Sequence, residues 1–321
     1  MKIVVLDGYT LNPGDLDWNV FEGFGELEVY ERTSPDQLLD RARGAEILLS
    51  NKTVIGENAL DQLPGLQYIG VLATGYNVID VNAAAKRGIV VSNIPSYGTS
   101  SVAQFTFALL LELCHRAGLH SDAVRDGEWG RSADWCFTKS SLIELSGKTL
   151  GIIGFGLIGQ QTARIAQAFG MRIAVPDRGK PLPAEFGDAR ALSMERLFAE
   201  SDVLSLHCPL TADTKGIVNR DTLRLMKKSA LLVNTARGPL INDQDLADAL
   251  NEGIIAGAAL DVLSEEPPRT ANPLIGARNC LITPHIAWST REARTRLMET
   301  AADNVNCFLQ GKPQNVVSPA L

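Results

Sequence analysis

The sequence is poor in cysteine, and its cysteines are not arranged to cross-link the chain or to hold a metal. The 321 residues include 5 cysteines, an odd number, and no two of them form a CxxC pair. A disulfide framework or a zinc site is therefore not expected. We interpret all five as small buried apolar side chains of a cytoplasmic protein in a reducing compartment.

Long apolar runs and an excess of positive charge are also lacking. The apolar start of the chain breaks at Asp7, too early for a signal sequence, and the run FTFALLLEL is interrupted by Glu112. Neither run approaches the roughly twenty apolar residues of a membrane span. The formal net charge of −7 would on average repel a phosphate backbone. A membrane and a nucleic acid are therefore not expected partners.

Histidine is scarce as well, with 4 residues and no HxH, HxxxH or HExxH spacing, so no metal site is expected. His285 stands between Pro284 and an expected helix in the stretch ITPHIAWST. From the residues alone it is compatible with a packing residue at a strand end or with a catalytic acid–base group. His207 in SLHCPLT also follows an expected strand, and His115 and His120 are interpreted as helix-end residues.

What the chain does contain is a steady alternation of short β-rich runs with helical patterns. Strands are expected at KIVVL, ILLSN, YIGVL and IVVSN in the first hundred residues, and six more follow residue 148: TLGIIG, RIAV, VLSLH, ALLVN, AGAALDV and LITPH. Such a rhythm predicts an α/β protein with parallel sheets covered on both faces. A buried helix is expected from about residue 100 to 115, and a long amphipathic helix from 289 to 309.

A glycine fingerprint marks the start of the second series of strands. Gly154, Gly156 and Gly159 form GxGxxG between an apolar strand and a helix, which is the context of a dinucleotide phosphate loop. Asp177 ends the next strand, about twenty residues later, where an acidic residue bonds the adenosine ribose. A carboxylate there repels a 2′-phosphate and favours NAD over NADP, although the adjacent Arg178 could accept that phosphate.

Several further motifs occur in a fixed order, and together they resemble one family. These are GFGLIG, LHCPLT, NTARG, LDVLSEEP and TPHIAW. The chain resembles the D-isomer-specific 2-hydroxyacid dehydrogenases over nearly its whole length, and YGTSSVAQFTFALLLEL and GEWGRSADWCF are most similar to the glycerate dehydrogenase/hydroxypyruvate reductase branch. The resemblance implies two doubly wound parallel-sheet domains, a Rossmann NAD domain at residues 99–291 and a flavodoxin-like substrate domain at 1–98 plus 292–321, with the catalytic cleft between them.

The resemblance implies three catalytic residues at strand ends. Arg237 would bind the substrate, His285 would give and take the proton, and Glu266 would partner the histidine. The chemistry asks for these types, because histidine titrates near neutral pH, a carboxylate on its far nitrogen fixes the tautomer, and arginine forms a planar fork for a carboxylate. Each also has a plain alternative: a surface ion pair, a solvated loop acid or a helix cap.

Further contacts are implied by the same resemblance. The expected cofactor contacts, besides the glycines, Asp177, Arg237 and His285, are Leu157, Ile158, His207, Cys208, Pro209, Thr214, Thr235, Ala236, Asp261 and Ala287. Asp261 would accept a hydrogen bond from the nicotinamide carboxamide. The expected substrate contacts, besides Arg237 and His285, are Asn51, Lys52, Thr74 and Gly75.

The segment GEWGRSADWCF resembles the family's dimerisation loop, so a homodimer through residues 99–147 is expected. Its aromatic side chains suit an interface and would equally suit packing against the long helix. The expected reaction is the reversible NADH-dependent reduction of hydroxypyruvate, and of glyoxylate, to D-glycerate and glycolate. Two alternatives stay open: an NAD(H)-sensing, corepressor-like binding protein of the same fold, and a dehydrogenase for another 2-oxo acid such as phosphohydroxypyruvate.

Overall fold

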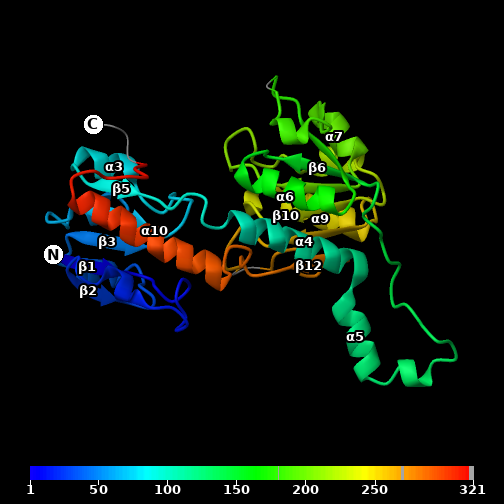
Figure 1. The fold of residues 1–321 in the computed structure, drawn as a ribbon, viewed down its shortest axis with the longest axis horizontal. Coiled ribbons are helices and arrows are strands. Elements are labelled where there is room, and N and C mark those ends of the chain that lie inside the picture. Colours follow the sequence, from blue (N-terminus) through cyan, green and yellow to red (C-terminus); the bar gives the residue numbers. More distant parts are fainter. Residues whose placement is uncertain (180, 269–270, 318–321) are drawn as a thin grey trace. The chain divides into compact units, whose positions relative to one another are not determined.

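A computed structural model describes residues 1–179, 181–268 and 271–317, and its chain forms two compact units (Figure 1). The first unit comprises Met1–Gly98 and Trp288–Leu321, and the second comprises Thr99–Ala287. The sequence predicted that the second domain ends at residue 291 and that the first domain resumes at residue 292. Residues 318–321 of that predicted segment lie outside the described residues. Each unit is built on its own parallel sheet.

The sheet of the first unit has five strands in the order β2-β1-β3-β4-β5. All its pairs are parallel. The strands are β1 (Lys2–Val5), β2 (Glu26–Val29), β3 (Ile47–Ser50), β4 (Tyr68–Val71) and β5 (Val90–Ser92). This is the flavodoxin-like order, in which the chain changes direction across the sheet between β1 and β3.

Helices cover both faces of this sheet, because alternate residues of a strand point to opposite sides. Val4 packs in one buried cluster, while Ile3 and Val5 pack in another. The first cluster takes side chains from the helices on one face, and the second takes them from α10 and a short 3-10 helix, η1. The elements are α1 (Leu38–Ala42), α2 (Glu57–Leu60), α3 (Val81–Lys86), α10 (Arg291–Leu309) and η1 (Trp18–Phe21).

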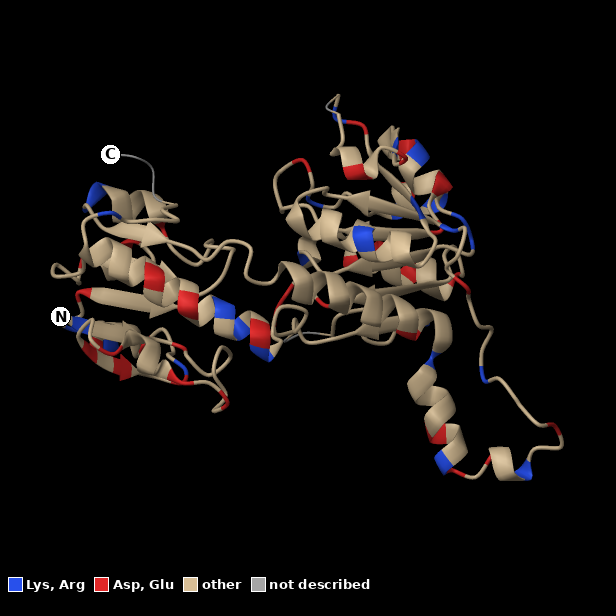
Figure 2. Ribbon diagram, viewed as in Figure 1, with Lys and Arg blue, Asp and Glu red and all other residues tan. Residues whose placement is uncertain are grey.

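Helix α10 is the longest described helix of this unit and carries both acidic and basic residues along its length (Figure 2). One of these charged residues is buried: Arg294 is only 7% exposed. Its guanidinium donates to both carboxylate oxygens of Asp15 at 2.7 Å and to the carbonyl of Leu11 at 3.0 Å. The buried charge is thus paired, and it anchors the helix to the loop after β1.

The sheet of the second unit has seven parallel strands in the order β12-β11-β10-β9-β6-β7-β8. Counted within the unit, this is the Rossmann order with one strand added at the end, and the direction reverses between β6 and β9. The strands are β6 (Thr149–Ile153), β7 (Arg172–Pro176), β8 (Arg190–Leu192), β9 (Val203–Leu206), β10 (Leu231–Asn234), β11 (Gly257–Leu260) and β12 (Cys280–Ile282).

Both faces of this sheet are covered too. Leu231 and Val233 of β10 pack in the cluster that contains α4 and α6, whereas Leu232 packs in the cluster of α7, α8 and α9. The helices are α4 (Thr99–His115), α5 (Ala117–Arg125), α6 (Leu157–Ala168), α7 (Met194–Glu200), α8 (Arg220–Leu225) and α9 (Asp243–Asn251), and the short 3-10 helices are η2 (Trp129–Arg131), η3 (Ala184–Phe186) and η4 (Gly238–Leu240). The predicted fold of two doubly wound parallel sheets is confirmed.

Two strands, β2 and β8, were not predicted from the sequence. Both pair only on one side and are partly exposed, so they lack the continuous apolar run of a central strand. Strand β2 reads ELEV, with two glutamates in four residues. The structure therefore has one more strand in each sheet than the apolar pattern indicates.

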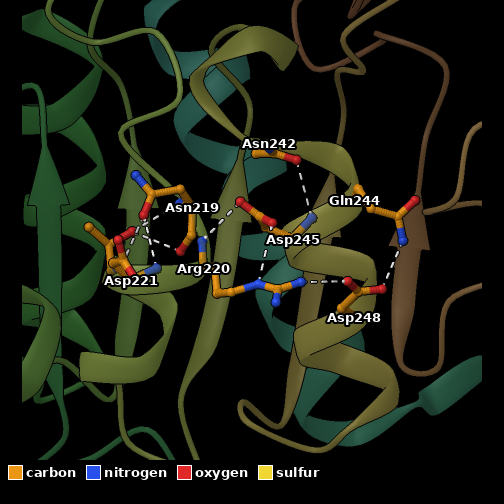
Figure 3. A network of polar contacts seen from close by, with 8 residues as sticks. Asn219, Arg220, Asp221, Asn242, Gln244, Asp245 and Asp248 are labelled. Atoms are coloured by element: carbon orange, nitrogen blue, oxygen red, sulfur yellow. Dashed lines mark hydrogen bonds and ion pairs between the residues drawn. The ribbon is translucent and has the colours of Figure 1, made fainter.

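Side-chain caps fix the helices that follow β9 and β10 (Figure 3). Asn219 and Thr222 form a capping box at α8, and Asn242 accepts from the backbone N–H of Asp245 at the start of α9. Arg220 then joins the two helices by ion pairs to Asp245 and Asp248 at 3.7 and 3.1 Å. The caps satisfy backbone N–H donors at the starts of the two helices. The ion pairs of Arg220 hold α9 against α8.

An arm, residues 117–147, leaves the second unit at the end of α4 and returns to it at the start of β6 (Figure 1). It includes α5 and η2 and is closed by contacts among its own residues. Trp129 Nε1 donates to the carbonyl of Trp135 at 2.9 Å, and Lys139 pairs with Glu128 at 2.7 Å. No helix within the described ranges of the chain is long and apolar enough to cross a bilayer.

Candidate active site

The glycine loop joins β6 to α6, and its three glycines have different surroundings. Gly154 has φ +103°, and a Cβ there would lie 2.3 Å from the backbone nitrogen of Cys208. A Cβ at Gly159 would lie 2.1 Å from the carbonyl oxygen of Gly154. Gly156 is the N-cap of α6, and a Cβ there would meet nothing within 4 Å. The first and third glycines are thus required by packing, whereas the second leaves an open approach to a helix N-terminus, which suits a pyrophosphate.

Asp177 lies immediately after β7, the neighbour of β6, so the structure brings it to the edge that carries the glycine loop. Its Oδ1 accepts a hydrogen bond from the N–H of Gly179 at 2.9 Å, and its own N–H donates to the carbonyl of Leu192 at 2.8 Å. These bonds hold an exposed carboxylate at the strand end, where the ribose of a dinucleotide is expected.

The loop after β9 packs directly on the glycine loop. The N–H of His207 donates to the carbonyl of Ile153 at 2.7 Å, and the Nε2 atom of His207 lies 2.9 Å from the hydroxyl of Ser205. Burial lowers the pKa of His207 to about 4, so this ring is neutral at neutral pH. Thr214 closes the same loop by donating to the carbonyl of Pro209 at 2.7 Å. His207 therefore shapes the wall beside the glycine loop.

Glu266 and His285, which follow β11 and β12, form a close pair. Nδ1 of His285 lies 2.6 Å from Oε2 of Glu266, and Oε1 of Glu266 accepts from the N–H of Leu263 at 2.9 Å. The carboxylate is thus held by the backbone on one oxygen and holds the imidazole with the other. Such a contact favours the tautomer that carries its proton on Nδ1.

Arg237 follows β10 and is brought next to the Glu266 loop by the glycine beside it. A Cβ at Gly238 would lie 1.9 Å from the carbonyl group of Leu263, so backbone packs on backbone at this point. Asn234 braces the same turn, because its side chain accepts from the N–H of Ala236 at 3.0 Å and donates to the carbonyl of Arg237 at 2.9 Å. Arg237 is an exposed residue, and its Nη1 donates to the carbonyl of Ala236 at 2.6 Å. The structure therefore places the three predicted residues on adjacent strand ends.

Asp261, which was predicted to contact the nicotinamide, is buried and hydrogen-bonded within the protein. It is 1% exposed, and its carboxylate accepts from the Thr283 hydroxyl at 2.6 Å and from the N–H groups of Ile286 and Ala287 at 2.9 and 2.8 Å. Burial raises the pKa of Asp261 against the effect of these bonds. The residue braces the turn on which His285 takes a left-handed backbone conformation, φ +56°.

Other predicted cofactor residues lie in the same region of the second unit. Thr235 bonds to the hydroxyl of Thr106 at 3.1 Å, and the carbonyl of Ala287 accepts from Ser101 at 2.6 Å. Helix α4 thereby holds two of the loops at this edge. Leu157 is 60% exposed at the first position of α6, beside the open glycine.

Apart from Arg237 and His285, which belong to the second unit, the predicted substrate residues lie in the first unit, on the loops that follow β3 and β4. Lys52 is exposed, whereas Asn51 is 3% exposed and donates its amide to the carbonyl of Leu72 at 2.6 Å. Thr74 donates to the carbonyl of Ile94 at 2.8 Å and precedes Gly75. The structure brings these two loops to one edge of the five-stranded sheet, and it gives Asn51 a bracing role.

Four residues that hold these loops were not predicted from the sequence: Asn234, Gly238, Asp243 and Asp7. Asp243, at the start of α9, accepts from Asn272 at 2.7 Å and from the Ser264 hydroxyl, so it holds the loop that carries Glu266. The motif NTARG contains two of these residues, and that pattern was the only signal for them. Asp7 had no signal beyond its place at a strand end.

The fold and these strand-end residues define an α/β dehydrogenase of the dinucleotide-binding class. Residues 107–287 match the family model described as "D-isomer specific 2-hydroxyacid dehydrogenase, NAD binding domain". The chain is 51% identical to a hydroxypyruvate reductase of Blautia hydrogenotrophica, over 99% of this chain and 100% of that protein. It is 38% identical to a glycerate dehydrogenase of Methylorubrum extorquens, over 98% of each.

A solved structure of the TT0316 protein from Thermus thermophilus is similar with a TM-score of 0.85 and 36% identity, covering 99% of this chain and 100% of that one. The chain belongs to the D-isomer-specific 2-hydroxyacid dehydrogenase family. The family resemblance found in the motifs is thereby confirmed, and so is a nicotinamide cofactor.

Proposed function

We propose that the protein reduces hydroxypyruvate to D-glycerate, and glyoxylate to glycolate, reversibly and with NADH. The observation that carries the proposal is the 2.6 Å contact between His285 and Glu266 on the strand ends beside Arg237. The 51% identity to a hydroxypyruvate reductase supports the choice of substrate within the family. A reductase of 2-oxo acids needs a proton donor and a cation that binds the substrate carboxylate. In this proposal His285 is the proton donor and Arg237 is the cation.

Each residue has one task in the proposed reaction. The nicotinamide, when bound, supplies the hydride to the carbonyl carbon. His285 gives a proton from Nε2 to the carbonyl oxygen and takes it back in the oxidative direction. Glu266 keeps the imidazole in the tautomer with hydrogen on Nδ1 and stabilises its protonated form. Arg237 binds the substrate carboxylate and carbonyl with its planar fork.

The glycine loop and the residues that follow β7 fit NAD. Gly156 leaves room for the pyrophosphate at the N-terminus of α6, and Asp177 presents a carboxylate to the ribose. That carboxylate would repel a 2′-phosphate, so we assign NAD as the preferred cofactor, with Arg178 as the residue that limits the preference. Apparent affinities for NADH and NADPH, measured side by side, test this assignment.

We assign substrate binding by the first unit to Lys52, Thr74 and Gly75, with Asn51 behind them. Their loops follow adjacent strands, β3 and β4, at the carboxyl edge where this type of sheet binds ligands. We also propose that the protein is a homodimer formed through residues 99–147. Trp135 and Trp129 of the arm are 86% and 52% exposed, which is unusual for such large apolar side chains and suits an interface.

The proposed function is tested by following NADH consumption with a panel of 2-oxo acids that includes hydroxypyruvate, glyoxylate, pyruvate and phosphohydroxypyruvate. We expect the highest kcat/KM with hydroxypyruvate. Faster turnover of another acid would correct the substrate. A folded protein that binds NADH and turns over none of them would refute the proposal and favour the NAD-sensing alternative.

A further inference from the structure

Asp7 lies two residues beyond the end of β1, and its carboxylate holds the backbone of the loop after β3. Its Oδ1 accepts from the N–H of Asn51 at 2.8 Å, and its Oδ2 accepts from the N–H groups of Lys52 and Thr53 at 2.5 and 2.8 Å. Three consecutive backbone donors thus meet one carboxylate, across 44 to 46 positions of sequence. Charge-assisted bonds of this kind are stronger than neutral ones.

The position of this contact in the sheet gives it a functional meaning. Strands β1 and β3 are neighbours, but β2 lies on the other side of β1, so the chain changes direction across the sheet at this point. In open α/β sheets ligands bind at the carboxyl ends of the strands beside such a switch point. Asp7 therefore bridges the two strand ends that flank the expected ligand crevice of the first unit.

The bridge continues to the next strand. Asn51 is buried and donates to the carbonyl of Leu72, just beyond β4, and the N–H of Leu72 donates to the carbonyl of Ser50 at 2.8 Å. The hydroxyl of Ser50 in turn donates to the carbonyl of Thr53 at 3.0 Å. The backbone on either side of Lys52 is thereby fixed, while the Lys52 side chain is exposed.

We propose that Asp7 is a positioning residue for substrate binding, which anchors the loop that presents Lys52 to the carboxylate of the 2-oxo acid. The inference rests on the proposed function, because Lys52 is assigned to the substrate there. An aspartate is needed because both of its oxygens accept hydrogen bonds. An asparagine would offer one acceptor and would turn an NH₂ group toward backbone N–H donors. The three N–H groups also offset the negative charge of Asp7 beside an anionic substrate.

The test compares the wild type with Asp7→Asn. We expect the KM for hydroxypyruvate to rise about tenfold, because the loop that carries Lys52 is no longer held in place. A tenfold change corresponds to about 1.4 kcal/mol of lost binding. We expect kcat at saturating substrate to stay within about twofold, since the lost interaction is made equally in the ground state and the transition state. NADH affinity, measured by fluorescence, should be unchanged. Amide hydrogen exchange at Asn51, Lys52 and Thr53 should become faster.

Asp80→Asn is the matched control. The carboxylate of Asp80 caps α3 in the same unit by accepting from the N–H of Ala83 at 2.9 Å, so the variant loses the same charge and weakens a comparable backbone contact that does not involve the N–H groups of residues 51–53. We expect its KM to equal that of the wild type. If Asp7→Asn fails to fold, Asp7→Glu takes its place, because it keeps the charge and shifts both oxygens by one methylene; it should also raise KM.

Two results would overturn the inference: an unchanged KM in a folded Asp7 variant, or an equal rise of KM in Asp80→Asn. Absence of turnover in the wild type would refute the proposed function alone. In that case the exchange measurement still decides, because unaltered protection of Asn51–Thr53 in Asp7→Asn would show that the carboxylate does not anchor the loop.

Discussion

The two carboxylate oxygens of Glu266 make different contacts: Oε1 accepts from the backbone N–H of Leu263, and Oε2 lies 2.6 Å from Nδ1 of His285. In Glu266→Gln the amide oxygen can still accept from Leu263, but an NH₂ group then faces the Nδ1 atom of His285. We expect kcat/KM for hydroxypyruvate to fall by about 100-fold to 10,000-fold, because the histidine loses the carboxylate that orients it. Steady-state kinetics measure this, with Tm as a check on folding.

The neighbouring acid provides the control for this substitution. Glu265→Gln removes the same charge one position earlier in the same loop, and we expect its kcat/KM to stay within about threefold of the wild type. Equal losses in the two variants would mean that the loop charge matters, and that the contact with the histidine does not.

His207 gives the protein a pH-dependent stability that comes from a residue with no assigned catalytic task. Its pKa is lowered from 6.5 to about 4 by burial, so the unfolded chain takes up this proton more readily than the folded one. The free energy of unfolding should therefore fall as the pH drops from about 6.5 toward 4, by roughly 1–3 kcal/mol, and be unaffected by this group above that window.

Urea unfolding at pH 7 and pH 5 measures the effect. His207→Gln keeps a nitrogen within reach of Ser205 and removes the titration, so its stability should change less between the two pH values than that of the wild type. Parallel changes in the two proteins would rule out His207 as the source.

At the scale of elements, two glycines at the junction of β6 and α6 are needed for different reasons: Gly159 for close packing, and Gly156 for the approach of the pyrophosphate. Gly159→Ala would place a Cβ 2.1 Å from the carbonyl oxygen of Gly154, whereas Gly156→Ala meets nothing within 4 Å. We expect Gly159→Ala to lower Tm by several degrees. We expect Gly156→Ala to keep Tm within about 2 °C and to weaken NADH binding about tenfold, because the methyl group lies in the path of the pyrophosphate.

Thermal unfolding and NADH fluorescence titration on both variants make this comparison. Unchanged NADH affinity in Gly156→Ala would show that the pyrophosphate does not approach at this glycine, and the glycine loop would then be structural only.

The elements also show how far the sequence predicts this molecule. Strands with continuous apolar runs, such as β6 and β10, were predicted, because burial on both faces demands such runs. The edge strands β2 and β8 were not, since at least half of the residues in each are exposed. The residues Arg237, Glu266 and His285 were predicted from family motifs, but the contacts of Asp7 with Asn51 and of Gly238 with Leu263 were not. Such contacts join segments far apart in sequence, and only the strand order brings them together.

At the scale of the whole molecule, the exposed apolar side chains of the arm predict association. We expect the wild type to sediment as a dimer and Trp135→Glu to shift toward monomer, because a charge replaces a side chain that is 86% exposed in the single chain. Ile275→Glu, at a position 61% exposed outside the arm, is the control and should remain dimeric. Sedimentation velocity over a range of concentrations distinguishes these outcomes. A monomeric wild type would refute the proposed interface.

The central claim is that His285 transfers the proton in a reduction of 2-oxo acids. The most direct measurement is the rate of hydroxypyruvate reduction by His285→Ala, together with its affinity for NADH. We predict a fall in kcat of at least about 100-fold, with the NADH dissociation constant within about twofold of the wild type. A rate equal to that of the wild type, in a variant that binds NADH normally, would contradict the claim.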